Sequence, residues 1–220
     1  EADLGFAKYV KSHYMEWMDA ISARLRGKHT DVSCPFMSQD VFKGKVFPLI
    51  DKGEKVFMIV IDNFRWDQWI MLSKEIGGYF DIHEDMYMSI LPTATQYARN
   101  AIFSGLMPNK IAQMFPELWV DEDEEEGKNL NEEPLIRTQI ERFRRHDKFS
   151  YNKINDSDAA SKLLQQFNAL KENDINVVVI NFIDMLSHAR TESKMVRELA
   201  NNESAYRSIT LSWLRHSVIA

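Results

Sequence analysis

The sequence predicts an α/β fold in which a mostly parallel sheet is flanked by helices and preceded by a helical module. Two continuous apolar runs rich in β-branched residues, "VFMIVI" at 56–61 and "INVVVI" at 175–180, are typical of strands buried on both faces. Stretches with helical spacing of apolar residues lie between and around these runs. Strands that alternate with helices indicate a parallel sheet covered by helices.

The first 50 residues are predicted to form a helical linker module, and residues 51–220 are predicted to form the domain that carries the chemistry. Apolar residues recur at helical spacing between residues 4 and 26, which predicts an amphipathic helix there. "RGKHTDVSCP" breaks this helix, and "SQDVFKGKVFPLID" is expected to be short helical or irregular structure that ends at Pro48.

The next elements follow the first apolar run. "RWDQWIMLSKEIGG" is predicted to be a helix that stops at Gly77 and Gly78. "YMSIL", residues 87–91, is predicted to be a second strand, and residues 96–105 a second helix that ends at Gly105. The first half of the domain thus follows the order strand, helix, strand, helix.

The second half of the domain begins with "DEDEEE", residues 121–126, which is expected to be a solvated acidic loop. "KFSYNKI", residues 148–154, is predicted to be a strand. "DSDAASKLLQQFNALKEN" is predicted to be a helix capped by Asp156 or Ser157, and helices are expected after the strand at 175–180.

Composition narrows the class of protein. A net charge of −6 argues against a surface that binds nucleic acid through a basic face, but not against an enzyme that handles a phosphate ester. Cys34 is the single cysteine, which excludes an internal disulfide and favours a reduced, cytoplasmic setting. The apolar runs are too short to span a bilayer.

The two ends of the chain suggest a fragment of a longer protein. The sequence begins with Glu1 rather than Met and ends inside the helical pattern "LSWLRHSVIA". We therefore expect neighbouring segments on both sides.

Polar side chains follow the predicted strands where ligands usually bind in α/β sheets, at the carboxyl ends. Asp62 follows "VFMIVI", Thr93 and Thr95 follow "SIL", and Asp184 and His188 follow "INVVVINFI". Aspartate oxygen and histidine nitrogen are normal zinc ligands. The i, i+4 spacing of Asp184 and His188 lets both point the same way if a helical turn starts there. The set predicts a site for a hard cation.

Each of these residues also has a structural alternative. Asp62, Thr95 and Asp184 could each cap the helix that follows, and His188 could be an ordinary surface histidine. Arg65 could contact a phosphate or simply be solvated. Recurrence of compatible groups at three strand-to-helix junctions favours the functional interpretation. No P-loop motif is present.

The order of these motifs resembles the alkaline phosphatase superfamily: strand and Asp62, then "PTAT" with its second threonine opening a helix, then Asp184-x-x-x-His188. "VIDNFRWDQW" and "LPTATQYARNAIFSGLMP" resemble, more narrowly, the PglZ domain. Overall, the chain is similar to response regulators of the PorX type, which join a phosphorylatable receiver domain to a PglZ effector through a helical linker. The resemblance covers about residues 40–220.

This resemblance implies a site with two zinc ions and an alkaline-phosphatase-like fold that is incomplete in this chain. Asp62 would bind one zinc, Thr95 would be the nucleophile beside that zinc, and Asp184 and His188 would bind the other zinc. Such enzymes need a later Asp-His pair and a further histidine, and only His216 follows His188. We therefore expect the 220-residue chain to be metal-poor and nearly inactive.

Three functions remain open at this point. The resemblance implies a zinc-dependent phosphodiesterase that acts on oligonucleotides and is switched by its receiver domain. The second is an interaction module with a structural metal that binds a sigma factor or a membrane-bound secretion-system partner. The third is a phosphomonoesterase or sulfatase of the same superfamily. An unpaired sheet edge could also favour a homodimer.

Overall fold

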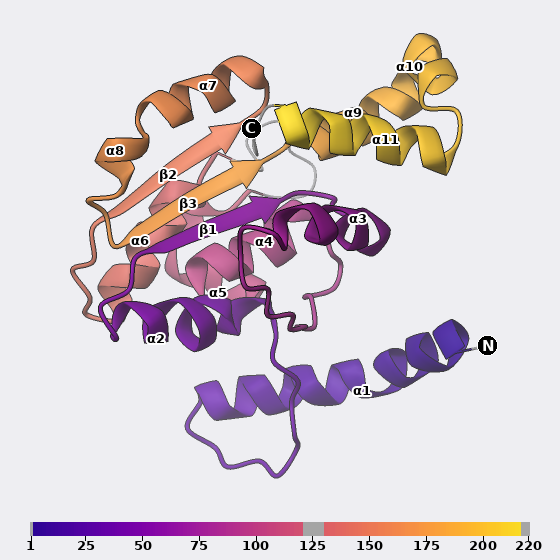
Figure 1. Ribbon diagram of the computed structural model, residues 1–220. Helices are drawn as coiled ribbons and strands as arrows, with labels where there is room; N and C mark the ends of the chain where they lie inside the picture. The colour runs from indigo at the N-terminus through magenta and orange to yellow at the C-terminus, as the bar shows by residue number, and fades with distance from the viewer. Residues whose placement is uncertain (1, 121–129, 217–220) are drawn as a thin grey trace. The chain divides into compact units, whose positions relative to one another are not determined.

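The computed structural model describes residues 2–120 and 130–216, which form two compact units (Figure 1). The helical unit comprises residues 1–41 and 85–131, and the sheet unit comprises residues 42–84 and 132–220, apart from the residues that are not described. The acidic run at 121–126 lies outside the described residues, so its loop structure stays a prediction.

The sheet unit contains a parallel sheet of three strands, which confirms the predicted α/β class. The strands are β1 (Val56–Ile61), β2 (Phe149–Ile154) and β3 (Ile175–Ile180), in the order β1-β3-β2. Val56 and Phe149 both pair with Ile175, so the strands start and end in register. In Figure 1 the three arrows point the same way, and α3, α9 and α11 lie toward their carboxyl ends.

The two long apolar strands differ in burial. Every residue of β3 is buried, as predicted. On β1, Phe57 is 38% exposed and Ile59 is 54% exposed, so the prediction of burial on both faces is wrong for this strand. The reason is position: β3 lies between two strands, whereas β1 pairs with β3 alone among the described residues. An apolar run does not reveal which of the two positions a strand takes.

The remaining elements of the sheet unit are helical and agree in outline with the helices predicted. They are η2 (Phe42–Val46), α2 (Phe47–Ile50), α3 (Trp66–Ile76), α6 (Glu132–Arg142), α7 (Ser157–Gln165), α8 (Phe167–Leu170), α9 (Phe182–Glu192), α10 (Lys194–Leu199) and α11 (Glu203–Leu214). Asp156 is the N-cap of α7, since its Oδ1 accepts a hydrogen bond from the Ala159 N–H at 2.8 Å.

A hydrophobic core joins α3, α9 and α11. Leu72 of α3 and Ile183 of α9 are buried in one cluster with Leu211 and Leu214 of α11. A second cluster packs Ile154, Val178 and Ile180 of the sheet against Ala160 of α7. The ring of Phe182 stacks on the ring of Trp213, with 4.1 Å between the centroids. Both residues are partly buried and pack against both clusters. The start of α9 is therefore held firmly beside the end of β3.

The helical unit consists of α1 (Ala2–Leu25), η1 (Ser38–Asp40), α4 (Thr95–Ser104), α5 (Pro108–Met114) and η3 (Pro116–Leu118). The predicted helices at 4–26 and 96–105 are confirmed as α1 and α4. Gly105 ends α4 with φ 62°, in the left-handed region that favours glycine. In the part of the chain that the structure describes, no helix is both long and apolar enough to cross a bilayer.

The predicted strand "YMSIL" does not join the sheet. Met88 forms an isolated parallel bridge with Met37, and its N–H donates to the Phe36 carbonyl at 2.8 Å. Met37 and Ile90 are buried with Ala101 in the core of the helical unit. Of this segment only Ile90 is buried, against the helical unit, whereas Tyr87 and Leu91 are exposed, and the apolar pattern alone does not reveal that the segment stays outside the sheet.

Candidate active site

The carboxyl edge of the sheet carries three of the predicted site residues. Asp62 follows β1 directly, and its N–H donates to the Ile180 carbonyl at the end of β3, at 3.0 Å. Helix α9 begins at Phe182 and brings Asp184 and His188 out from the same end of β3. Neighbouring parallel strands therefore deliver these three polar groups to the edge where α/β proteins bind ligands.

The helix-capping alternatives are not supported. Arg65 is the N-cap of α3, and its N–H donates to Gln68 Oε1 at 2.9 Å. Asn181 is the N-cap of α9, and Ala94 is the N-cap of α4. Asp62, Asp184 and Thr95 thus do not occupy the N-cap positions of these helices, and Asp184 lies in the first turn of α9 rather than at its cap.

The Asp62 carboxylate is held next to a sharp turn. Its Oδ1 accepts a hydrogen bond from the Asn63 N–H at 3.1 Å. Asn63 has φ 56°, a left-handed conformation that asparagine tolerates better than most residues. This turn separates β1 from α3, so the carboxylate lies on a loop rather than on the helix.

Asp184 and His188 form a pair on the first turns of α9. His188 Nε2 lies 3.6 Å from Asp184 Oδ2, as the i, i+4 spacing predicts. The His188 side chain is 69% exposed and the Asp184 side chain is 32% exposed. An exposed pair of this kind contributes only about 0.5 kcal/mol to stability, so its stabilising effect is a weak reason for the arrangement.

Thr95 is the first residue of α4 and is half-buried, whereas Thr93 is exposed. The N–H groups of Tyr97 and Ala98 donate to the Ala94 carbonyl at 3.0 and 2.9 Å, which fixes the first turn of the helix. The N-terminus of a helix carries a partial positive charge that favours an anion. The threonine hydroxyl is therefore placed where a phosphate would be stabilised.

The structure brings together some of the predicted site residues. Asp184 and His188 are paired, and Asp62 leaves the sheet at the same edge. Thr95 belongs to the helical unit and the other three residues belong to the sheet unit. The convergence of Thr95 with Asp62, Asp184 and His188 therefore stays a prediction.

The described residues provide few donor side chains for a zinc ion. Among residues 2–120 and 130–216, no group of three or more His, Cys, Asp or Glu side chains could hold a metal ion. The Asp184–His188 pair offers two donors, whereas zinc sites use about three or four protein ligands. The described donors do not make a zinc site on their own.

Arg65 lies in an ion-pair cluster at the start of α3. Its Nε and Nη2 donate to the two carboxylate oxygens of Asp67 at 3.0 and 2.9 Å, and its Nη1 donates to Glu203. Arg207 Nε also donates to Asp67 at 2.9 Å, and Arg190 Nη1 donates to Glu203 at 3.2 Å. The Arg65 hydrogen bonds hold the pKa of Asp67 at about 2. Arg65 is thus committed to two carboxylates, which argues against a contact with phosphate.

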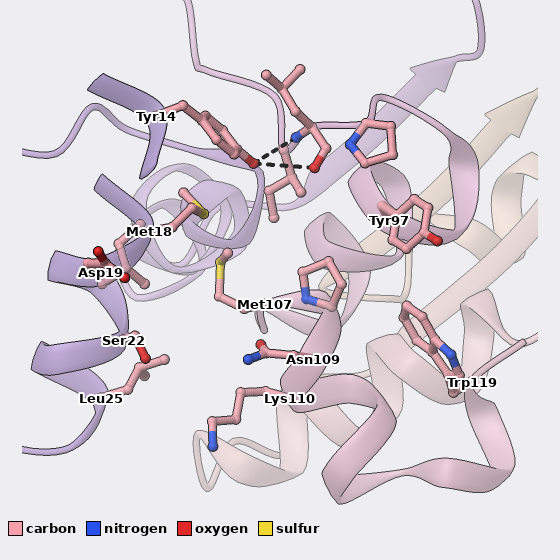
Figure 2. Close-up of a pocket in the computed structure, with 15 residues that line it drawn as sticks. Tyr14, Met18, Asp19, Ser22, Leu25, Tyr97, Met107, Asn109, Lys110 and Trp119 are labelled. Atoms are coloured by element: carbon pink, nitrogen blue, oxygen red, sulfur yellow. Dashed lines mark hydrogen bonds between the residues drawn. The ribbon is translucent and has the colours of Figure 1, made fainter. Parts of the chain in front are cut away.

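The sequence did not reveal a contact directly before the "PTAT" motif. The Leu91 N–H donates to the hydroxyl of Tyr14 at 2.8 Å, and that hydroxyl donates to the Leu91 carbonyl at 3.4 Å (Figure 2). The two residues are 77 positions apart, and Tyr14 looks like any other residue of an amphipathic helix. One hydroxyl therefore fixes the backbone four residues before Thr95.

These observations define the class of the protein. A parallel sheet flanked by helices, with carboxylate and imidazole groups at its carboxyl edge, is consistent with an alkaline-phosphatase-like fold. The model of the BREX system PglZ alkaline phosphatase-like domain matches residues 41–218, and the chain belongs to this family. Among curated proteins, none matches the chain.

Family membership confirms the resemblance to the PglZ domain that the motifs indicated. It indicates a hydrolase of the alkaline phosphatase superfamily with a phosphoester substrate. The matched region includes Asp62, Thr95, Asp184 and His188, and it leaves residues 1–40 outside.

Proposed function

We propose that this chain carries the nucleophile of a phosphodiesterase, and that Thr95 is that nucleophile. The observation that carries the proposal is that Asp62 and the Asp184–His188 pair leave neighbouring parallel strands at one edge without acting as helix caps. The family match supports phosphoester hydrolysis. The half-buried position of Thr95 at the start of α4 supports its role.

In the proposed reaction, Thr95 Oγ1 attacks the phosphorus atom and a new oxygen–phosphorus bond forms. The bond between phosphorus and the oxygen of the leaving alcohol breaks, and the threonine proton is released to the departing alcohol or to solvent. Water then cleaves the threonyl ester and restores the hydroxyl. Covalent catalysis of this kind divides one difficult displacement into two easier ones.

We further propose a division of metal ligands, with Asp62 and Thr95 on one zinc ion and Asp184 and His188 on another. Support for this division comes from the resemblance of the motifs and from the metal dependence usual in the superfamily. Since each pair supplies two donors, further ligands beyond these four residues are required.

The wider context is also a proposal. The similarity to PorX-type regulators supports a response regulator in which residues 1–50 link a receiver domain to the hydrolase at 51–220. In this setting the substrate is an oligonucleotide in the cytoplasm. A sigma factor, a membrane-complex partner and a second copy of the chain are the candidate protein partners.

The proposal is tested by substituting the two threonines of "PTAT" separately. In the intact parent protein, Thr95→Ala should lower phosphodiester hydrolysis by on the order of a thousandfold or more, because the covalent route is lost. Thr93→Ala is the matched control and should keep most of the activity, since Thr93 is exposed. Thermal unfolding of both variants should match that of the unaltered protein.

A panel of diesters, monoesters and sulfate esters identifies the reaction. A preference for diesters supports the phosphodiesterase, and a preference for monoesters or sulfate esters replaces it with the other superfamily activities. Equal hydrolysis by the Thr95→Ala variant and the unaltered protein would show that Thr95 is not the nucleophile.

A further inference from the structure

The helical unit contains a cavity of about 660 Å³ next to the "PTAT" motif (Figure 2). Helix α1 forms one side of it with Tyr14, Met18, Asp19, Ser22 and Leu25. Met107, Asn109, Lys110, Tyr97 and Trp119 line it from the other elements. Its volume lies within the range of small-molecule sites, roughly 300–1,000 Å³.

The cavity adjoins Thr95 on both sides along the chain. Leu91, just before the motif, and Pro92, its first residue, line the cavity, and so does Tyr97, two residues after Thr95, whereas Thr95 itself is not among the lining residues. Tyr97 lies in the first turn of α4, where its N–H donates to the Ala94 carbonyl at 3.0 Å. A group bound in this cavity would therefore be held beside the start of the helix that carries the threonine.

The walls of the cavity suit a flat apolar group. Tyr14, Tyr97 and Trp119 contribute aromatic rings, and the rings of Tyr97 and Trp119 are 5.8 Å apart. The Tyr14 hydroxyl is already engaged by the backbone of Leu91. The other apolar lining residues include Met18, Ile21, Ile90 and Met107. Apolar walls with a few polar groups are typical of ligand sites.

The polar side chains in the cavity lining are Asp19, Ser22, Asn109 and Lys110, and the Ser22 hydroxyl accepts a hydrogen bond from Arg26 Nη1 at 3.0 Å. Lys110 Nζ donates to Gln113 Oε1 at 3.0 Å, and Asp19 is exposed. The lining is thus mostly apolar, with a few polar side chains that could contact polar substituents of a ligand.

We infer that this cavity holds the organic group of the phosphoester, and that the preferred substrates carry an aromatic ring on that group. The inference rests on the proposed role of Thr95 as nucleophile. The ring is bound among Tyr14, Tyr97 and Trp119, while the phosphorus is presented to Thr95 at the start of α4. The cavity thus determines which phosphoesters are accepted.

The test measures binding of two simple probes, phenylphosphonate and methylphosphonate, by calorimetry. Both carry the same anionic group and differ only in the ring. Phenylphosphonate should bind at least about tenfold more tightly, because burial of an aromatic ring in an apolar site is favourable.

Two serine-to-phenylalanine substitutions on α1 test whether the cavity binds the ring. Ser22→Phe places a ring into the cavity from α1 and should abolish the preference for phenylphosphonate. Ser12→Phe is the control, since Ser12 is exposed on the same helix and does not line this cavity. Ser22→Ala removes the hydroxyl that accepts from Arg26 but adds no volume, and it should bind like the unaltered protein. Circular dichroism confirms that the variants are folded.

The outcomes separate this inference from the proposed function. Equal binding of the two probes, or an unchanged preference in folded Ser22→Phe, overturns the cavity assignment even if hydrolysis depends on Thr95. A preference abolished by Ser22→Phe but not by Ser12→Phe supports the cavity. If that preference is found but Thr95→Ala leaves hydrolysis unchanged, the cavity assignment stands and the proposed nucleophile is wrong.

Discussion

At the scale of single residues, the Tyr14 hydroxyl is the contact that best explains how the backbone before "PTAT" is held. It accepts from the Leu91 N–H and donates to the Leu91 carbonyl, so it satisfies both backbone groups of one residue. Leu91 has an exposed side chain, and without this contact its backbone groups would rely on solvent.

Tyr14→Phe should therefore loosen this segment. We expect a loss of about 1 kcal/mol in the free energy of unfolding, the usual contribution of one hydrogen bond, and faster hydrogen exchange at the Leu91 amide. Tyr9→Phe on the same helix is the control, because Tyr9 is exposed and its ring stacks on His13. An unchanged exchange rate at Leu91 would show that Tyr14 does not hold the segment.

The Asp67 carboxylate gives a prediction about pH. Its pKa is held at about 2, below the ordinary 3.8, mainly by hydrogen bonds from Arg65. A carboxylate with a lowered pKa stabilises the folded state above its unfolded pKa, and this contribution is lost as the pH falls from 3.8 to about 2. Asp67→Asn should remove about 1 kcal/mol of stability at pH 7, since the ion pairs are partly exposed.

The measurement is the free energy of unfolding between neutral and acidic pH. Asp67→Asn should show a smaller decline in acid than the unaltered protein does. Asp158→Asn is the control. Asp158 lies in the first turn of α7, the same helix position that Asp67 has in α3, but its side chain is exposed. Parallel acid profiles for the Asp67 variant and the unaltered protein would contradict the assignment.

At the scale of elements, two strands of the sheet differ in how much their burial contributes to the free energy of unfolding. Ile180 of β3 is fully buried, whereas Ile59 of β1 is 54% exposed. Ile180→Ala should cost about 2–5 kcal/mol because it leaves a cavity in the core. Ile59→Ala is the same change on the neighbouring strand and should cost about 1 kcal/mol or less. Chemical denaturation of both variants measures the difference, and equal losses would contradict the observed burial.

The predicted elements were mostly confirmed, because strong local signals identify them. The apolar run of β3 and the glycines that end α3 and α4 are such signals. "YMSIL" was misassigned because its short apolar run makes only an isolated bridge at Met88 and buries only Ile90, in the core of the helical unit. Exposure of β1 was missed because sheet order depends on pairing between distant segments, which a local pattern does not contain.

At the scale of the whole molecule, one topological rule located much of the candidate site. Asp62, Asp184 and His188 follow parallel strands, so their common edge could be predicted from sequence. The cavity could not, because its walls combine α1 with residues near 91, 97, 107 and 119. Such a wall exists only after these distant segments have packed together.

The number of available donors gives a prediction about metal content. The 220-residue chain should bind less than one zinc ion per chain tightly, because two donors in a pair fall short of the three or four that zinc uses. Elemental analysis after dialysis measures this. Two zinc ions retained per chain would show that histidines such as His216 or His83 complete the sites.

The central claim is that Thr95 becomes covalently bonded to phosphorus, and trapping that adduct tests it most directly. The full protein is mixed with a phosphoester substrate, quenched in acid during turnover and digested for mass spectrometry. We predict a phosphoryl adduct on Thr95 in the peptide that contains "PTAT", and no adduct in the Thr95→Ala variant. Turnover without any adduct, or an adduct on Thr93, would contradict the account.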